Sequence, residues 1–191
     1  MSRLRTFVAV PLERAVRSRL VALQEALARA AGDVKWVEPE NLHVTLLFLG
    51  EVDEREVAGV CRAAGEACAG VAPFPMSVER VGWFGSARRP RTVWAGVGTG
   101  AQEVVALHDA VEAPLLELGC YRREERQYTP HVTLGRVKSD RPNDRLAQAL
   151  AKEAGWRGGE AVVREVLVMS SQLTPRGPVY SVLSTAPLGR P

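Results

Sequence analysis

Lysine, cysteine and histidine are all scarce in this chain of 191 residues, and each occurs three times. The lysines are Lys35, Lys138 and Lys152, so 22 of the 25 basic residues are arginine. Arginine is favoured where a planar, two-point contact with phosphate is needed, but a GC-rich genome also encodes much arginine and alanine. With a formal net charge of +3, the composition permits a phosphate-bearing partner without requiring one.

The cysteines, Cys61, Cys68 and Cys120, form no CxxC pair. A structural zinc site needs a tighter ligand cluster than these scattered cysteines and histidines provide. A disulfide scaffold is not expected in a domain of this size. We therefore expect reduced thiols, a cytoplasmic protein and no bound metal.

Long apolar segments are also missing. No run approaches the roughly 18 residues that a membrane-spanning helix needs, and the apolar stretch after Arg5 ends at Glu13, which is too short for a secretory signal. We expect neither export nor a membrane partner. The apolar share of 46% and the charged share of 25% are typical of a soluble globular protein, with one domain or two small lobes.

The hydrophobic pattern alternates between helical and strand periods. Helices are predicted at Leu12–Ala31, Asp53–Ala69, Ala101–Leu118 and Asn143–Ala154. Strands are predicted at Arg3–Val10, Lys35–Val37, Leu42–Leu49, Met76–Trp83, Arg91–Val97, His131–Lys138, Ala161–Met169 and Val179–Thr185. Short connections favour hairpins and mostly antiparallel sheets. The order of elements repeats without a flexible linker between the halves, which predicts a duplicated α+β fold with residues 1–191 as a single two-lobed domain.

The tetrapeptide His-Val-Thr-Leu occurs twice, beginning at His43 and at His131, and the two copies lie 88 residues apart. This separation is close to half the chain, as an internal duplication requires. Alternate residues of a strand point to the same face. Each histidine therefore projects beside its threonine, Thr45 or Thr133, and the intervening residues point into a core. If the lobes are related by a pseudo-twofold axis, the two pairs face each other across one cleft.

A pair of histidines suits in-line substitution at phosphorus. Histidine has an unperturbed pKa of about 6.5, so a neutral imidazole can activate the nucleophile while a protonated one donates to the leaving oxygen. The hydroxyls of Thr45 and Thr133 can donate to the phosphoryl oxygens. A metal site is the main rival, but no carboxylate stands two residues from either histidine. The third histidine, His108, is predicted to lie on a helix surface.

The two His-x-Thr-x motifs resemble those of the two-histidine phosphoesterases, and most closely the bacterial and archaeal RNA 2′,3′-cyclic phosphodiesterases, also called 2′-5′ RNA ligases. Further segments fit the same family in order. They are Trp36 to His43 running into Phe48 to Val52, Arg89-Pro90-Arg91 before Val93 to Gly96, Thr129-Pro130-His131 before Gly135-Arg136, and Ser171 to Pro175 with Gly177 to Tyr180. The resemblance covers nearly the whole chain.

The resemblance implies a bilobal pseudo-twofold duplication, with two mostly antiparallel sheets facing a central cleft and helices outside. It implies metal-independent hydrolysis of a terminal RNA 2′,3′-cyclic phosphate to a 2′-phosphate, with no cofactor. His43 would be the proton donor and His131 the proton acceptor. Some members also join RNA ends through the reverse, 2′-5′ ligation reaction.

The family also places an arginine five positions after the second histidine to hold phosphate, which is Arg136 here. Strand alternation puts Arg136 on the face opposite His131, unless a bulge at Gly135 re-aims it. Phe48, Phe84 and Tyr128 are candidates for stacking on a base, and Tyr128 is the best of them. By strand alternation, Phe48 points away from the cleft and into the core.

The arginines Arg88, Arg89, Arg91, Arg122, Arg123 and Arg126 either line an RNA path or are solvated surface charges. Two other functions stay open. One is a non-catalytic module that binds an RNA end or a nucleotide, and the other is a phosphodiesterase for a small cyclic nucleotide. No obligate protein partner is evident.

Overall fold

The computed structural model describes residues 2–30, 32–86, 88–123, 127–139, 141–175 and 177–189. Within them the strands are β1 (Arg3–Pro11), β2 (Val34–Trp36), β3 (His43–Asp53), β4 (Phe74–Ser86), β5 (Arg89–Val97), β6 (His131–Val137), β7 (Arg157–Val163), β8 (Glu165–Thr174) and β9 (Gly177–Pro187). The helices are α1 (Arg14–Ala28), α2 (Glu54–Ala69), α3 (Ala101–Glu117), α4 (Asp144–Lys152) and the short 3-10 helix η1 (Pro39–Asn41).

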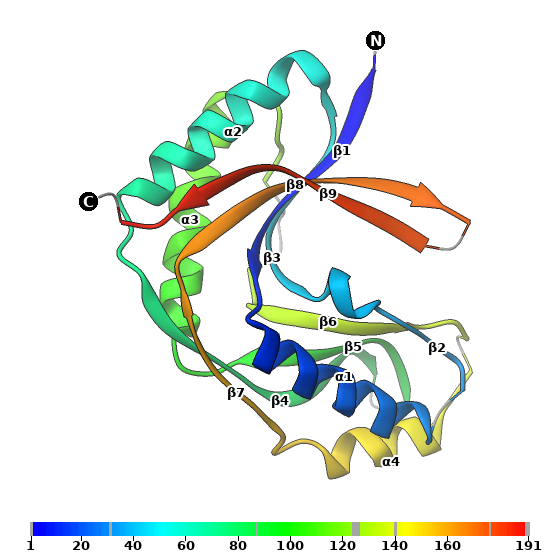
Figure 1. Ribbon diagram of the computed structural model, residues 1–191. Coiled ribbons are helices and arrows are strands. Elements are labelled where there is room, and N and C mark those ends of the chain that lie inside the picture. The colour runs from blue at the N-terminus through cyan, green and yellow to red at the C-terminus, as the bar shows by residue number, and fades with distance from the viewer. Residues whose placement is uncertain are drawn as a thin grey trace.

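The strands form one curled antiparallel sheet in the order β7-β4-β5-β6-β3-β1-β8-β9, with β2 paired to β6 outside this path (Figure 1). Its halves join where β3 and β6 pair through Val44 and Val132. Strand order is mirrored about this junction, as a pseudo-twofold duplication requires. The α+β fold and the antiparallel pairing are as predicted. The two predicted sheets are instead halves of one continuous sheet, because β3 and β6 pair with each other.

Each half of the sheet draws on both halves of the chain. The C-terminal strands β8 and β9 extend the half that contains β1 and β3, and α1 packs against β7 in the other half. Helices α2 and α3 lie together beside the first half, and α1 and α4 lie beside the second (Figure 1). In the part of the chain that the structure describes, no helix is both long and apolar enough to cross a membrane. The assignment of residues 1–191 to a single two-lobed domain stays a prediction.

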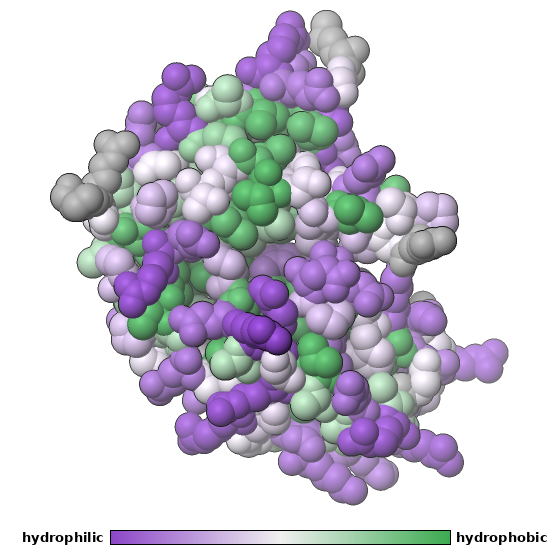
Figure 2. Space-filling view, in the orientation of Figure 1, coloured by the Kyte–Doolittle hydropathy of each residue, from purple (hydrophilic) through white to green (hydrophobic). Residues whose placement is uncertain are grey.

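The apolar core lies between the sheet and the helices. Val44 and Val132 at the junction are fully buried, as is Leu134 in β6. The helical spacing of α3 predicts core positions at Val104, Leu107, Val111 and Leu115, and these are fully buried, whereas Leu118, predicted at the same spacing, is exposed. Figure 2 shows apolar surface gathered over the upper half of the molecule and polar surface across the middle and the lower half.

Several predicted strands differ at their ends by two or three residues, and two differences have a clear structural cause. The segment Ala161–Met169 is not one strand, because at Arg164 the chain passes from pairing with β4, as β7, to pairing with β1, as β8. The strand predicted to end at Leu49, just before Gly50, continues to Asp53. Gly50 has a φ of 72° and lies at a register shift between β1 and β3, so this glycine marks a bulge and not a strand end.

A close approach fixes β2 against β6. Trp36 pairs with Gly135 in the antiparallel ladder. A Cβ atom on Gly135 would lie 2.6 Å from Val34 Cγ1 and 2.9 Å from Trp36 Cε3. Real Cβ atoms do not approach carbon so closely, so β2 lies where it does because residue 135 has no side chain.

Replacement of this glycine should therefore destabilise the fold. We expect Gly135→Ala to lower the free energy of unfolding by about 1–3 kcal/mol, the usual effect of overpacking, measured by urea denaturation. Gly59→Ala is the matched control, because Gly59 lies in helix α2 with no atom within 4 Å of its added Cβ. This control should raise the free energy of unfolding by about 0.5–1 kcal/mol, because alanine favours a helix more than glycine does. Equal stability of the two variants would contradict the packing argument.

Candidate active site

The junction between the two halves of the sheet brings the repeated motifs together. Val44 and Val132 are paired and buried, so the residues on either side of them in each strand project to the opposite face. That face carries His43 and Thr45 from β3. It also carries His131 and Thr133 from β6. The two His-Thr pairs therefore lie on one face of the sheet, as the sequence predicted.

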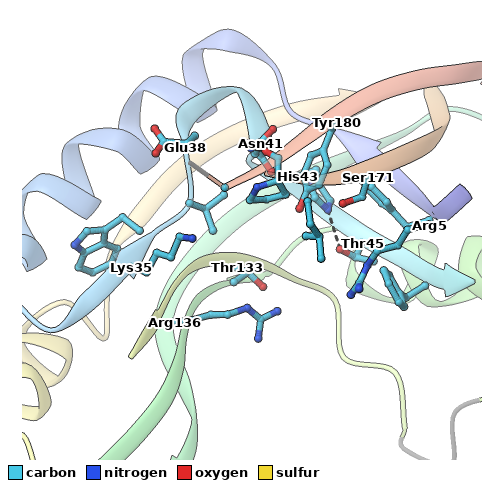
Figure 3. Close-up of a pocket in the computed structure, with 17 residues that line it drawn as sticks. Arg5, Lys35, Glu38, Asn41, His43, Thr45, Thr133, Arg136, Ser171 and Tyr180 are labelled. Atoms are coloured by element: carbon cyan, nitrogen blue, oxygen red, sulfur yellow. Dashed lines mark hydrogen bonds between the residues drawn. The ribbon is translucent and has the colours of Figure 1, made fainter. Parts of the chain in front are cut away.

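Both histidines are oriented by the same backbone contact. Nδ1 of His43 lies 2.7 Å from the carbonyl oxygen of Asn41, and Nδ1 of His131 lies 2.7 Å from that of Thr129. A carbonyl only accepts, so Nδ1 carries the hydrogen in both rings. In the neutral imidazole, Nε2 is then the basic nitrogen. Nε2 of His43 is 2.9 Å from the Thr45 hydroxyl (Figure 3).

Aromatic rings from neighbouring strands pack against each histidine. Phe7 of β1 stacks on His43 with a centroid distance of 5.1 Å, and Tyr180 of β9 meets it edge-on at 5.7 Å. The second site repeats this arrangement. Phe84 of β4 meets His131 edge-on with a centroid distance of 5.1 Å, and the centroid of the Trp94 ring of β5 lies 6.3 Å from that of His131. Of these aromatic neighbours, Phe84 alone was considered as a site residue from the sequence, while Trp94 and Tyr180 lie in segments that fit the family.

Burial is the main reason why the pKa of each histidine lies below the ordinary value of 6.5. For His43, the hydrogen bond to Asn41 partly offsets this effect, and the charge of His131 lowers the pKa further. For His131, the bond to Thr129 partly offsets it, and the charge of Arg136 lowers the pKa further. At neutral pH both rings are therefore mainly neutral in the free protein.

A bulge in β6 brings Arg136 to the face of the histidines. Trp94 pairs with Thr133 but Val93 pairs with Gly135, so Leu134 is an extra residue in β6. Leu134 and Gly135 are both buried, and the next side chain, Arg136, returns to the cleft. The simple alternation argument against Arg136 therefore fails, and the bulge suggested by Gly135 is present.

A buried glutamine supports this bulge. Nε2 of Gln24 in α1 donates to the carbonyl oxygens of Leu134 and Val37, both at 2.8 Å. Gln24 is only 6% exposed, and the Leu134 carbonyl oxygen also accepts from the Val37 N–H at 2.9 Å, so buried polar groups here are satisfied by one another. Sequence reasoning missed Gln24, because a single polar residue in an amphipathic helix gives no sign of its distant partner.

The same bulge occurs in β3 and overturns the prediction for Phe48. Ala9 pairs with Thr45 but Val8 pairs with Leu47, so Leu46 is the extra residue. Phe48 is not in the core. It is 39% exposed and lines the cavity beside His43. The guanidinium carbon of Arg5 lies 4.7 Å from the centre of its ring.

Two adjoining cavities form the cleft, and they share Thr133 and Arg136. The cavity that contains His43 has a volume of about 360 Å³, and the one that contains His131 has a volume of about 670 Å³. Figure 3 shows the first cavity, in which His43 and Thr45 lie across from Thr133 and Arg136. The shared residues place Arg136 between the two histidines.

The cleft is strongly cationic. Arg5, Lys35 and Arg136 line the first cavity, and Arg89 and Arg91 line the second. Among the described residues that line either cavity, Glu38 is the only acid. An anionic ligand would be attracted to this cleft.

Three other arginines considered for an RNA path, Arg88, Arg122 and Arg123, line neither cavity. Arg88 and Arg122 are exposed. Arg123 forms an ion pair with Glu112 at 2.8 Å. Arg126 lies outside the described residues.

Tyr128 does not line either cavity, so the structure gives its predicted stacking role no direct support. Its hydroxyl donates to the Thr45 carbonyl oxygen at 2.8 Å, and its ring stacks on His108 at 4.2 Å. His108 is only 9% exposed, so its predicted surface position was wrong. Since the next residue, Thr129, holds His131, Tyr128 ties the start of the second motif to the first.

One group of side chains in the described part of the chain has the composition of a metal site. Ligand atoms of His108, Asp109 and Glu112 lie within 4.8 Å of one another. Glu112 is already held by Arg123, and by the Tyr121 hydroxyl at 3.3 Å. The group lines neither cavity, and His43 and His131 do not belong to it.

The comparisons with known proteins agree with this geometry. A family model described as LigT like Phosphoesterase matches residues 10–94 and again residues 97–180. The chain belongs to the LigT-like phosphoesterase family. The two matches divide the chain as the repeated motif does, and each contains one His-Val-Thr-Leu. The predicted family and enzyme class are thus confirmed.

Relatives of this LigT-like protein carry a consistent name. The chain is 36% identical over 179 residues to an RNA 2′,3′-cyclic phosphodiesterase of Methanothermobacter thermautotrophicus, covering 94% of this chain and 96% of that one. It is 39% identical over 180 residues to one of Archaeoglobus fulgidus, covering 94% and 98%. The crystal structure of TT0787 of Thermus thermophilus superposes with a TM-score of 0.83 at 30% identity, covering 98% of this chain and all of that one.

Removal of the Tyr128 hydroxyl should disturb both motifs of this LigT-like protein. We expect Tyr128→Phe to lower the free energy of unfolding by about 1 kcal/mol, the usual worth of one hydrogen bond. The imidazole signals of His43 and His131 in NMR spectra should both shift. Tyr121→Phe, which loses a bond to Glu112, is the control and should leave both signals in place. Unchanged signals in Tyr128→Phe would show that Tyr128 does not tie the motifs together.

Proposed function

We propose that this protein hydrolyses the terminal 2′,3′-cyclic phosphate of RNA to a 2′-phosphate by metal-independent acid–base catalysis. One observation carries the proposal. Two histidines with the same locked orientation, Nδ1 bonded to a carbonyl at 2.7 Å, flank a cationic cleft that both motifs line. The names of the relatives at 36% and 39% identity support RNA as the substrate.

In the proposed reaction His131 is the general base and His43 is the general acid. Nε2 of neutral His131 takes a proton from water as the water oxygen bonds to phosphorus. The bond from phosphorus to the 3′ oxygen breaks, and Nε2–H of protonated His43 gives its proton to that oxygen. The products are a 2′-phosphate and a 3′-hydroxyl. Proton exchange with solvent then restores both histidines.

Arg136 and the threonines would hold the phosphate between the two histidines. Arg136 lines both cavities, and its guanidinium can donate to two phosphoryl oxygens at once. Thr133 also lines both cavities. The Thr45 hydroxyl is bonded to Nε2 of His43 in the free protein, so a bound phosphate competes with His43 for it.

Removal of either histidine tests the proposal. We expect His43→Ala and His131→Ala each to lower kcat on an oligonucleotide with a 2′,3′-cyclic end by about 100- to 10,000-fold. Wild-type activity should persist in excess EDTA. His108→Phe is the control, because it keeps a ring against Tyr128 outside the cleft, and it should stay within about tenfold of wild type.

The products of this assay separate the alternatives. A 2′-phosphate supports the proposal, and a 3′-phosphate contradicts its bond cleavage. Full activity in both alanine variants would show that neither histidine is the catalytic acid or base. Binding without turnover by the wild-type protein indicates the non-catalytic module, and turnover of only a cyclic mononucleotide indicates the small-substrate enzyme. Formation of a 2′-5′ bond with a 5′-hydroxyl strand would add the reverse reaction.

The pH dependence follows from the two lowered pKa values. Activity rises with pH as His131 loses its proton and falls as His43 loses its own. Both pKa values lie below 6.5 in the free protein, so the optimum of kcat/KM should lie below pH 6.5. A bound phosphate anion raises both pKa values, and the optimum of kcat should therefore lie at higher pH.

Replacement of Arg136 should shift the acidic limb of the pH profile of kcat/KM. Burial remains the main cause of the low pKa of His131, but Arg136 also lowers it. Arg136→Gln should therefore move the acidic limb of kcat/KM to higher pH and raise KM. Lys35→Gln, another cation of the cleft, is the control and should leave the acidic limb in place. An acidic limb that does not move in Arg136→Gln would exclude His131 as the base.

A further inference from the structure

A third cavity lies outside the cleft, where the end of helix α1 meets helix α4 (Figure 1). Its volume is about 380 Å³, and it is lined by the end of α1, by α4 and by residues that directly follow the two helices. The charged side chains around it are Arg29, Arg145, Lys152 and Glu153. No acid in the described part of the chain forms an ion pair with any of these three cations. An anion would therefore be attracted to this cavity.

One face of α4 lines this third cavity. Arg145, Gln148 and Lys152 stand at positions i, i+3 and i+7, so they share one face of the helix. Leu146 and Leu150 are fully buried on the opposite side, which holds the polar face outward. The three polar side chains are exposed, and all of them line the cavity. Arginine, lysine and glutamine side chains are donors that commonly bind the phosphates of nucleic acids.

The turn between β4 and β5 connects the third cavity with the cleft. Arg89, at the start of β5, lines the second cavity of the cleft. The carbonyl oxygen of the preceding residue, Arg88, accepts from the backbone N–H of Asn143 at 3.1 Å. Asn143 is the residue just before α4, and Arg145 of the third cavity follows two residues later. A strand that leaves the second cavity over this turn therefore meets α4 next.

The charges around the cleft favour this exit for a polyanion. Arg89, Arg91 and Arg136 line the second cavity, and no described residue that lines it is an acid. The hairpin of β8 and β9, which borders the first cavity, has no charged side chain among its described residues from 166 to 186. Attraction to backbone phosphates supplies much of the affinity of proteins for RNA strands. We therefore expect a strand to follow the arginines and not the uncharged hairpin.

We propose that the RNA strand on the 5′ side of the cyclic phosphate leaves the cleft through the second cavity, crosses the β4–β5 turn at Arg88 and binds along α4. Arg145 and Lys152 each hold a backbone phosphate. This assignment rests on the proposed function and deepens it, because it gives the unreactive part of the RNA a binding surface. Helix α4 has 9 residues and is about 14 Å long. A mononucleotide in the cleft does not reach along it, so the protein binds an RNA of several nucleotides more tightly than a mononucleotide.

Binding of product RNAs tests this surface without turnover. Calorimetry would compare an RNA of about eight nucleotides that ends in a 2′-phosphate with adenosine 2′-monophosphate. The double variant Arg145→Gln/Lys152→Gln should bind the longer RNA about 10- to 30-fold more weakly at about 0.1 M salt, and the slope of log K against log salt should become less steep by about 1.4. Binding of adenosine 2′-monophosphate should stay within about twofold, because it makes no contact with α4. Both replaced side chains are exposed, so the variant should fold, which circular dichroism would check.

Arg14→Gln/Arg62→Gln is the matched control. It removes the same net charge from exposed positions on α1 and α2 that line none of the three cavities. The control should leave the salt slope for the longer RNA as in the wild-type protein. An equal loss of affinity in the two double variants would show that net charge alone attracts the RNA, and this would overturn the proposal. A wild-type slope in Arg145→Gln/Lys152→Gln would overturn it too.

Turnover separates this RNA surface from the proposed reaction. If the wild-type protein binds the longer RNA through α4 but hydrolyses no cyclic phosphate, the RNA surface stands and the proposed function fails. If the wild-type protein hydrolyses a cyclic mononucleotide and a longer cyclic-ended RNA with the same kcat/KM, and the α4 variant does the same, the reaction stands and the RNA surface fails.

Discussion

The backbone pairing of Val44 with Val132 is the constraint on which the site depends. It joins the two halves of the sheet, and both side chains are fully buried against the core. Because neighbours along a strand alternate between faces, the same pair that closes the core sends His43 and His131 into the cleft. The relative position of the histidines is thus set by the backbone pairing of the two strands at this point.

Two bulges then modify the alternation that this ladder imposes. Without the extra residues Leu46 and Leu134, the fifth side chain after each histidine would point into the core. A charged guanidinium there would be costly to bury. With the bulges, the cleft gains Arg136 on one side and Phe48 on the other. The irregularities of the sheet, and not its regular part, provide the contacts that distinguish the two halves.

The contrast between regular strands and bulges explains which site residues the sequence could predict. The four motif residues follow from strand alternation and the internal repeat, and both are local patterns. Phe48 was misassigned because a bulge reverses alternation, and Leu46 gives no local sign of one; in β6 the glycine at 135 did. Phe7 and Tyr180 could not be found, because they reach His43 only through the pairing of β1, β8 and β9. His108 was placed on a helix surface and Tyr128 in a stacking role, because a helical pattern gives no sign that the two rings stack on each other.

In the proposed reaction, the electrostatics of the cleft make acid–base catalysis depend on the ligand. Burial, followed by neighbouring positive charge, keeps the pKa of His131 low, and His43 is buried as well. The free protein at neutral pH therefore holds two bases and no acid. A bound phosphodiester brings a negative charge among these groups, which raises the pKa of both rings and favours a proton on one of them. A neutral ligand of the same shape would leave both imidazoles unprotonated, so in the proposed reaction the charge that draws the substrate into the cleft also completes the acid–base pair.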